Sequence, residues 1–397
     1  MENSETDSMA ALQENPEEVS SDLQNKRNYG LDVLRTLAML FIVLHHLTNS
    51  EIWGEITESV YSQALSVNIT SAFLDCFFIV GVNVFFLLSG WLKIKLRAGK
   101  IFTLLAECYA IGIASVLLAY ITGSTQYEGV GQAALQALAF PFSHWFIPAY
   151  LLLCLLSPML NSLAEHLSPK GAAYALAVMV VIFSVVGFVA DYFFVNGVQQ
   201  DGALSKASYV GTNAGYSVVW ACVCYFTGRI LCMHTPKKLK SAGLPLAMYF
   251  AFCLINFAVL CFTVAVLKDG DATKWYIYCY NNPFTYFASV CLLCAFAHIK
   301  VNERVGKAFA FLSSHTFAVY IMHSDNPLLS PYRAYIVRLS GGNLLAQVLL
   351  LPLNAVVLFI IGVAVSCVYS VTAGRGAKKL GGLLDKKIDN LKINHRE

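Results

Sequence analysis

Apolar residues recur along this chain in blocks of about twenty, separated by short polar stretches. A helix of that length matches the hydrocarbon thickness of a bilayer, about 30 Å. Only 13% of the 397 residues are charged, about half the share of an ordinary soluble domain. The chain is therefore predicted to be an all-helical, multi-pass membrane protein, and a soluble enzyme is excluded.

The apolar blocks predict about ten transmembrane helices around a central cavity. They lie at about 29–48, 70–92, 101–121, 143–163, 172–195, 213–233, 243–267, 277–298, 308–326 and 344–370. If both termini are cytoplasmic, the inner segments hold 21 of the 27 Lys and Arg residues and the outer loops hold five. This is the bias of the positive-inside rule. We expect the cytoplasmic membrane of a bacterium, with the lipid bilayer as a partner.

The two ends of the chain differ from the apolar middle. Residues 1–28 are acidic and predicted to be a disordered cytoplasmic tail, residues 29–370 form the transmembrane domain, and residues 371–397 form a basic cytoplasmic tail. In that basic tail a helix on the inner leaflet and a solvated segment both fit the sequence. The net charge of +3 is too small to imply a nucleic-acid partner.

The cysteines and histidines do not predict a metal centre. Most of the 12 cysteines lie inside apolar blocks, where packing is their expected role. Cys291, Cys294 and His298 share a helical face, but no fourth ligand is in reach. We expect no metal and no permanently bound cofactor.

The first apolar block, "YGLDVLRTLAMLFIVLHHL", is interrupted by Asp32, Arg35, His45 and His46. Ionisable groups inside a bilayer are costly and usually functional. Arg35 and His46 are eleven residues apart, three turns plus about 20°, so they share one face about 16 Å apart along the axis. Asp32 is expected to neutralise Arg35, and His45 points about a quarter turn away. The plain alternative is a helix fastening by Asp32 and Arg35, with both histidines at the outer interface.

The spacing of Arg35 and His46 suits a long ligand that enters from the cytoplasm. Arginine holds phosphate through its planar, permanently charged fork. Histidine transfers protons because it titrates near neutrality. A donor with an anionic head near Arg35 would bring its reactive tip to His46.

These residues resemble the membrane-bound acyltransferase 3 family. The first helix contains Arg35, ten residues and His46, and the second span, "GVNVFFLLSGWLKIK", is similar to the family's Gly-Val-x-x-Phe-Phe-x-x-Ser-Gly signature. The fourth span, "HWFIPAYLLLCLLSPML", and the ninth, "FAVYIMHSDNPLL", resemble its later motifs, although His144 and Trp145 are adjacent here. The resemblance implies transfer of an acyl group, usually acetyl from acetyl-CoA, to a hydroxyl of a surface glycan or lipid-linked sugar, with His46 essential.

The resemblance and the topology together suggest the remaining site residues. We expect Lys93, Lys95 and Arg97 to hold the phosphates of the acyl-CoA co-substrate with Arg35, although topology alone also demands a basic inner loop. Candidate substrate-binding residues are Asn83, His144, Trp145 and His323. For His144 and Trp145, an interfacial anchor is the equal alternative.

We predict an O-acetyltransferase in which His46 is the general base and Arg35 assists. An acetyl-imidazole intermediate on His46 is the rival route. The alternative function is a secondary transporter, which would need coupling carboxylates deep in several spans. Asp32 and Glu107 are the only deep carboxylates that we identify. The sequence leaves the acceptor, the acyl length and the oligomeric state open.

Overall fold

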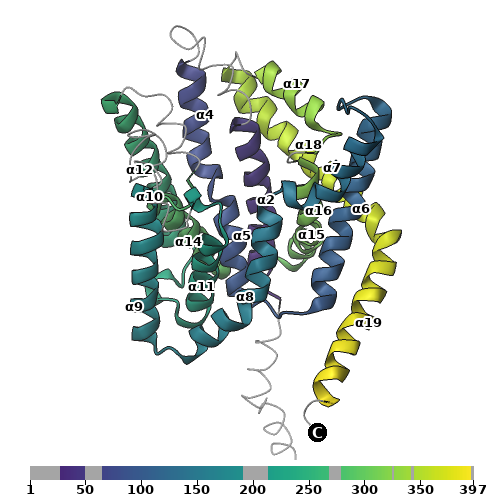
Figure 1. Ribbon diagram of the computed structural model, residues 1–397. Helices are drawn as coiled ribbons and strands as arrows, with labels where there is room; N and C mark the ends of the chain where they lie inside the picture. The colour runs from purple at the N-terminus through teal and green to yellow at the C-terminus, as the bar shows by residue number, and fades with distance from the viewer. Residues whose placement is uncertain are drawn as a thin grey trace, which may run out of the picture.

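The computed structural model describes residues 27–49, 65–190, 213–267, 279–323, 326–340 and 344–394. The regular structure in these ranges is helical, without a strand, which confirms the all-helical prediction (Figure 1). The predicted acidic tail lies outside the described residues except for its last two. The helical bundle is therefore the part of the chain on which a site can be built.

Seven spans in the described ranges are long and apolar enough to cross a membrane. They are α2 (Tyr29–Asn49), α4 with α5 (Leu65–Phe78 and Val80–Trp91), α6 (Ala98–Thr122), α8 (Phe146–His166), α9 continued through a π-helical segment into α10 (Pro169–Met179, Val180–Val186 and Gly187–Ala190), α12 (Gly243–Leu267) and α18 (Leu344–Val371). Two shorter apolar helices, α11 (Val218–His234) and α14 (Pro283–His298), match two more of the predicted spans. A polytopic membrane protein is confirmed, while the total of ten crossings stays a prediction.

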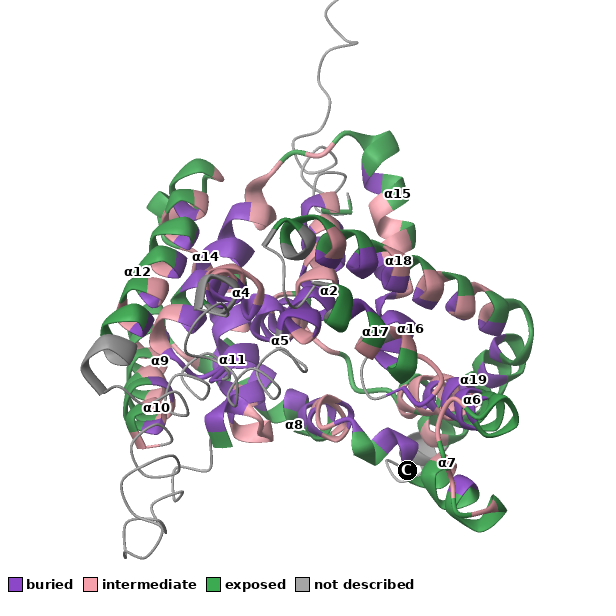
Figure 2. Ribbon diagram, turned by 90° about the horizontal axis from the view of Figure 1, so that it is seen from above, coloured by how far each residue is buried: buried purple, intermediate pink, exposed green. Residues whose placement is uncertain are grey.

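Helix α2, which carries Arg35 and His46, lies in the middle of the bundle. It packs against α4, α5, α14 and α18, and two thirds of its membrane span is buried. Figure 2 shows buried residues gathered on α2, α5 and α11, while exposed residues follow the rim of the bundle. The ionisable side chains of α2 are therefore held among protein elements, as the cost of placing charge in lipid requires.

Helix α5, a neighbour of α2, is in backbone contact with α11 on its other side. A side chain added at Gly90 of α5 would strike the carbonyl oxygen of Tyr225, and one added at Gly228 of α11 would strike the carbonyl oxygen of Leu87. Without a side chain at either position, α5 and α11 approach closely, as small residues allow between membrane helices. Helix α5, which packs on α2, is thus itself supported by α11.

The predicted single span at 308–326 is wrong, because the chain breaks at His315. Helix α15 (Glu303–Ser314) ends there with His315 at φ −108° and ψ 3°, and α16 (Thr316–His323) follows. Just before the break, the hydroxyl of Ser313 donates to the Asp32 carboxylate of α2 at 2.8 Å. Two segments without a predicted span are also helical, α7 (Val130–Ser143) and α17 (Ser330–Ser340).

The basic tail forms helix α19 (Ala373–Asn394), which packs along α6. The backbone N–H of Gly99 donates to Asp385 Oδ1 at 2.8 Å, and Gly99 and Gly381 are in close backbone contact. Leu380 and Leu384 are exposed on the other side. The tail is helical, as one of the two alternatives expects, and its place on the inner leaflet stays a prediction. Its attachment to α6 was not foreseen. In Figure 1, α19 ends on the side of the bundle where α2 begins.

Candidate active site

A cavity of about 440 Å³ opens beside Arg35 at the end of the bundle where α2 begins. We call this end the basic end, because the turn between α5 and α6 contributes three cationic side chains to the cavity wall and the first turn of α6 contributes a fourth. These are Lys93, Lys95, Arg97 and Lys100. The structure thus places Arg35 in one cavity with Lys93, Lys95 and Arg97, the three residues that we expect to hold phosphate with it.

The turn that carries these cations is held rigidly from two sides. Lys93 has a left-handed backbone, with φ of 55°, and the N–H of Ile94 donates to the Tyr225 hydroxyl at 3.1 Å. The Lys93 ammonium and the Arg229 guanidinium both bind Glu165 Oε1, at 2.6 and 2.8 Å. Lys93 is therefore partly neutralised, whereas Lys95 and Arg97 are exposed on the cavity wall.

Arg35 does not pair with Asp32, which corrects our expectation. Both carboxylate oxygens of Asp32 accept hydrogen bonds from Arg27, at 2.7 and 2.8 Å. These bonds raise the pKa of Arg27 above its ordinary value. Arg35 makes no hydrogen bond or ion pair with any residue that the structure describes, so its guanidinium can bind an anion that enters the cavity.

A second cavity of about 300 Å³ continues from Arg35 toward the opposite end of the bundle. The two cavities are adjacent at Arg35, because Arg35, Ser89, Leu104 and Tyr150 line both of them. The second also reaches Ile42 and Tyr320. Ile42 lies four residues before His46 on the same face of α2, so this cavity ends about one helical turn, roughly 6 Å, below His46.

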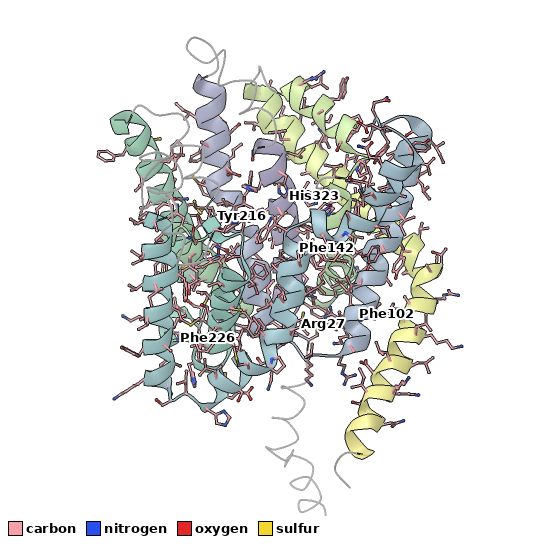
Figure 3. The ribbon with its side chains drawn as sticks, in the orientation of Figure 1. Arg27, Phe102, Phe142, Tyr216, Phe226 and His323 are labelled. Carbon is pink, nitrogen blue, oxygen red and sulfur yellow. The ribbon has the colours of Figure 1, made fainter. Side chains whose placement is uncertain are left out.

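His46 forms a hydrogen-bonded pair with His323 of α16. His46 Nδ1 and His323 Nε2 are 2.8 Å apart, and the ring centroids are 5.0 Å apart. Nδ1 of His323 lies 2.9 Å from the carbonyl oxygen of Val319, and only 3% of His323 is exposed. Figure 3 shows His323 in the upper half of the bundle, far from Arg27 at the basic end.

Tyr320 connects this pair to a third histidine. Its ring centroid lies 5.7 Å from that of His323 and 5.8 Å from that of His144. His144 is buried, with Nδ1 at 2.9 Å from the carbonyl oxygen of Phe140. Tyr320 also lines the second cavity. The imidazoles of His46, His323 and His144 therefore lie close to the end of that cavity that is farther from the basic turn.

His45 and Asp75 form a buried acid–base pair that we did not predict. His45 Nδ1 lies 2.7 Å from Asp75 Oδ1, and the Thr48 hydroxyl donates to the same oxygen at 3.2 Å. Asp75 is wholly buried in α4, so our statement that Asp32 and Glu107 are the only deep carboxylates is wrong. The sequence feature that could have predicted this buried carboxylate is the single Asp inside the apolar block "AFLDCFFIV".

None of the four predicted substrate-binding residues lines either cavity, and two of them, Asn83 and Trp145, make other contacts. The amide of Asn83 is wholly buried, donates to the carbonyl oxygen of Tyr280 at 2.8 Å and accepts from the Trp220 indole N–H at 2.9 Å. Asn83 therefore fastens α5 to α11 in the structure and is not a lining residue. Trp145 joins an aromatic cluster, with its ring centroid 4.8 Å from that of Tyr216 and 5.6 Å from that of Tyr280.

The residues that the structure describes contain no group of three or more His, Cys, Asp or Glu side chains that could hold a metal ion. The site thus consists of an open arginine, a basic turn and histidines that are bonded to one another. Such groups bind anions and transfer protons.

The comparisons with known proteins agree with this chemistry. A family model described as an acyltransferase domain, that of the acyltransferase 3 family, matches residues 28–371. Searches of curated proteins and of solved structures find no match. The family match covers most of the chain and includes every helix from α2 to α18. The protein therefore belongs to the acyltransferase 3 family and is a membrane acyltransferase.

Proposed function

We propose that the protein transfers an acyl group, acetyl in the first instance, from cytosolic acyl-CoA to a hydroxyl of a cell-surface glycan or lipid-linked sugar. One observation carries this proposal. The two cavities run from the basic turn, past Arg35, to one helical turn below His46. A cytosolic donor with an anionic head and a long, narrow arm fits such a path.

The basic end suits the head of the donor. Phosphate oxygens would meet Lys95 and Arg97 at the mouth and Arg35 deeper inside. Charge-assisted hydrogen bonds of this kind are about twice as strong as neutral ones. Because Arg35 has no protein partner among the described residues, binding phosphate there would break no existing ion pair.

His46 supplies the base at the inner end. Its neutral imidazole removes the proton from the acceptor hydroxyl as that oxygen attacks the thioester carbonyl carbon. The carbon–sulfur bond then breaks, and the departing thiolate takes the proton from the imidazolium, so that CoA leaves as a thiol. General-base catalysis of this type contributes about a hundredfold to ten-thousandfold to a rate.

The experiment compares cells that carry the native protein, the His46→Ala variant or neither, by mass spectrometry of their envelope glycans. His46→Ala should abolish the acetyl mass increment at unchanged protein abundance. His166→Ala is the matched control, because His166 is exposed at the end of α8 and lines neither cavity. Undiminished acetylation in His46→Ala cells would refute the proposal.

A binding measurement separates the donor from the acceptor. Purified protein in bilayer nanodiscs should bind acetyl-CoA, and His46→Ala should bind it with an affinity within about twofold of the native value, since His46 acts on the acceptor proton. A burst of CoA release without acceptor, together with an acetylated His46 in the mass spectrum, would instead support the acetyl-imidazole route.

A further inference from the structure

The hydrogen bonds of His323 decide which nitrogen of His46 carries its proton. Nδ1 of His323 faces the carbonyl oxygen of Val319 at 2.9 Å. A carbonyl oxygen only accepts, so the proton of a neutral His323 is on Nδ1 and its lone pair is on Nε2. In the opposite tautomer, the lone pair of His323 Nδ1 would face a lone pair of the Val319 carbonyl oxygen at 2.9 Å, which is repulsive.

The same reasoning passes from His323 to His46. The Nε2 lone pair of His323 lies 2.8 Å from His46 Nδ1, so His46 donates its Nδ1–H to His323. In neutral His46 the basic lone pair is therefore on Nε2. This order of bonds runs from the Val319 carbonyl through His323 to His46.

The backbone that sets this order is itself held in place. Val319 packs against Gly362 of α18, where an added side chain would strike the Val319 backbone. Past the end of α16, the Asn326 amide donates to the Ser115 hydroxyl of α6 at 3.0 Å and to the carbonyl oxygen of Ile321 at 3.3 Å. The backbone is thus held both before His323, at Val319, and after it, at Asn326.

We propose that His323 is the positioning residue of His46, so that two histidines do together what a histidine and a carboxylate do in other acyl-transfer enzymes. The proposal rests on His46 being the base. A neutral imidazole places no permanent charge beside the base, which lowers the cost of burying the pair in a bilayer. The carboxylate nearby, Asp75, binds His45 instead.

When His46 accepts a proton at Nε2, its bond to His323 becomes charge-assisted and stronger. Among the described residues, the titratable groups around the pair include His45 with Asp75 on α2 and α4, Tyr320 on α16, and His144 beside Tyr320. A variant that removes His323 therefore changes the pH at which His46 works, while these groups stay in place. A merely structural role would leave that pH unchanged.

The test uses acetyl transfer from labelled acetyl-CoA to endogenous acceptor in inverted membrane vesicles. His323→Leu should lower kcat by about tenfold to a hundredfold, leave KM for acetyl-CoA within about twofold, and move the acidic limb of the pH–rate profile to lower pH. His323→Gln carries an amide oxygen that can accept from His46 Nδ1–H, so it should restore at least a third of native kcat. His166→Ala is again the control.

A second readout does not depend on activity. Nitrogen NMR of isotope-labelled histidine in nanodiscs should show neutral His46 protonated at Nδ1 in the native protein, and this preference should be lost in His323→Leu. The positioning role would be overturned by either of two results: a native kcat and pH profile in folded His323→Leu, or His46 protonated at Nε2 in the native protein. In both cases an inactive His46→Ala would still support His46 as the base. An active His46→Ala would overturn both proposals.

Discussion

The two ends of the face of α2 that carries Arg35 and His46 are built on opposite plans. At the basic end, Arg35 lines two cavities and has no hydrogen bond or ion pair among the described residues. About 16 Å further along the helix, His46 is bonded to His323, and His45 beside it is bonded to Asp75. One end therefore leaves a partly buried positive charge without a paired side chain among the described residues, while the other end fixes its imidazoles through hydrogen bonds.

The largest effect that sharpens this contrast is expected at Arg35. Arg35→Gln should weaken acetyl-CoA binding by about tenfold to a hundredfold, because a hydrogen bond to a charged group contributes about 1.5–3 kcal/mol. The measurement is equilibrium binding to purified protein in nanodiscs. Arg304→Gln, an exposed change at the start of α15, is the matched control. Equal affinity of native protein and Arg35→Gln would break the contrast.

A change at the other end should affect stability and not donor binding. Asp75→Leu leaves the buried His45 ring without its acceptor, so we expect the free energy of unfolding to fall by about 1–3 kcal/mol. Asp75→Asn keeps an oxygen that can accept and should cost less. The midpoint of thermal unfolding reports the loss, and acetyl-CoA affinity should not change. A tenfold loss of that affinity would mean that the two ends are coupled.

The smallest effects are expected at the mouth of the first cavity. Lys95→Gln and Arg97→Gln should each weaken acetyl-CoA binding by up to about fivefold, since exposed charge pairs contribute about 0.2–1 kcal/mol. These losses should shrink as salt is added. Lys93→Gln should have less effect than either, because Glu165 already binds Lys93. A Lys93 effect larger than the other two would place the phosphates deeper in the turn.

The spans and the family motifs could be predicted because each follows from local sequence. An apolar block needs no partner to be recognised, and a spacing of eleven residues puts Arg35 and His46 on one face whatever surrounds the helix. Their shared orientation toward cavities and bonded histidines, and not toward lipid, agrees with that expectation. Their catalytic roles stay predictions.

The partners of these residues could not be predicted, because they come from distant parts of the chain. Asp32 could pair with either of two nearby arginines, and the chain before α2 folds back so that Arg27 takes both oxygens. Asp75 and His45 are 30 residues apart, and His46 and His323 are 277 apart. The Ser313 hydroxyl that lies just before the break at His315 binds Asp32, 281 residues away, and only the tertiary fold creates that contact.

The attachment of α19 has a practical meaning for anyone who engineers this chain. A lysine-rich end invites deletion, yet cutting after residue 372 would remove Gly381, which contacts Gly99 and Thr103 beside Lys100 on the wall of the first cavity. Affinity tags and fluorescent fusions are better placed ahead of Arg27. If a shortened form loses acetyl-CoA binding, the cause would be a disturbed entrance to the first cavity and not the loss of a catalytic residue.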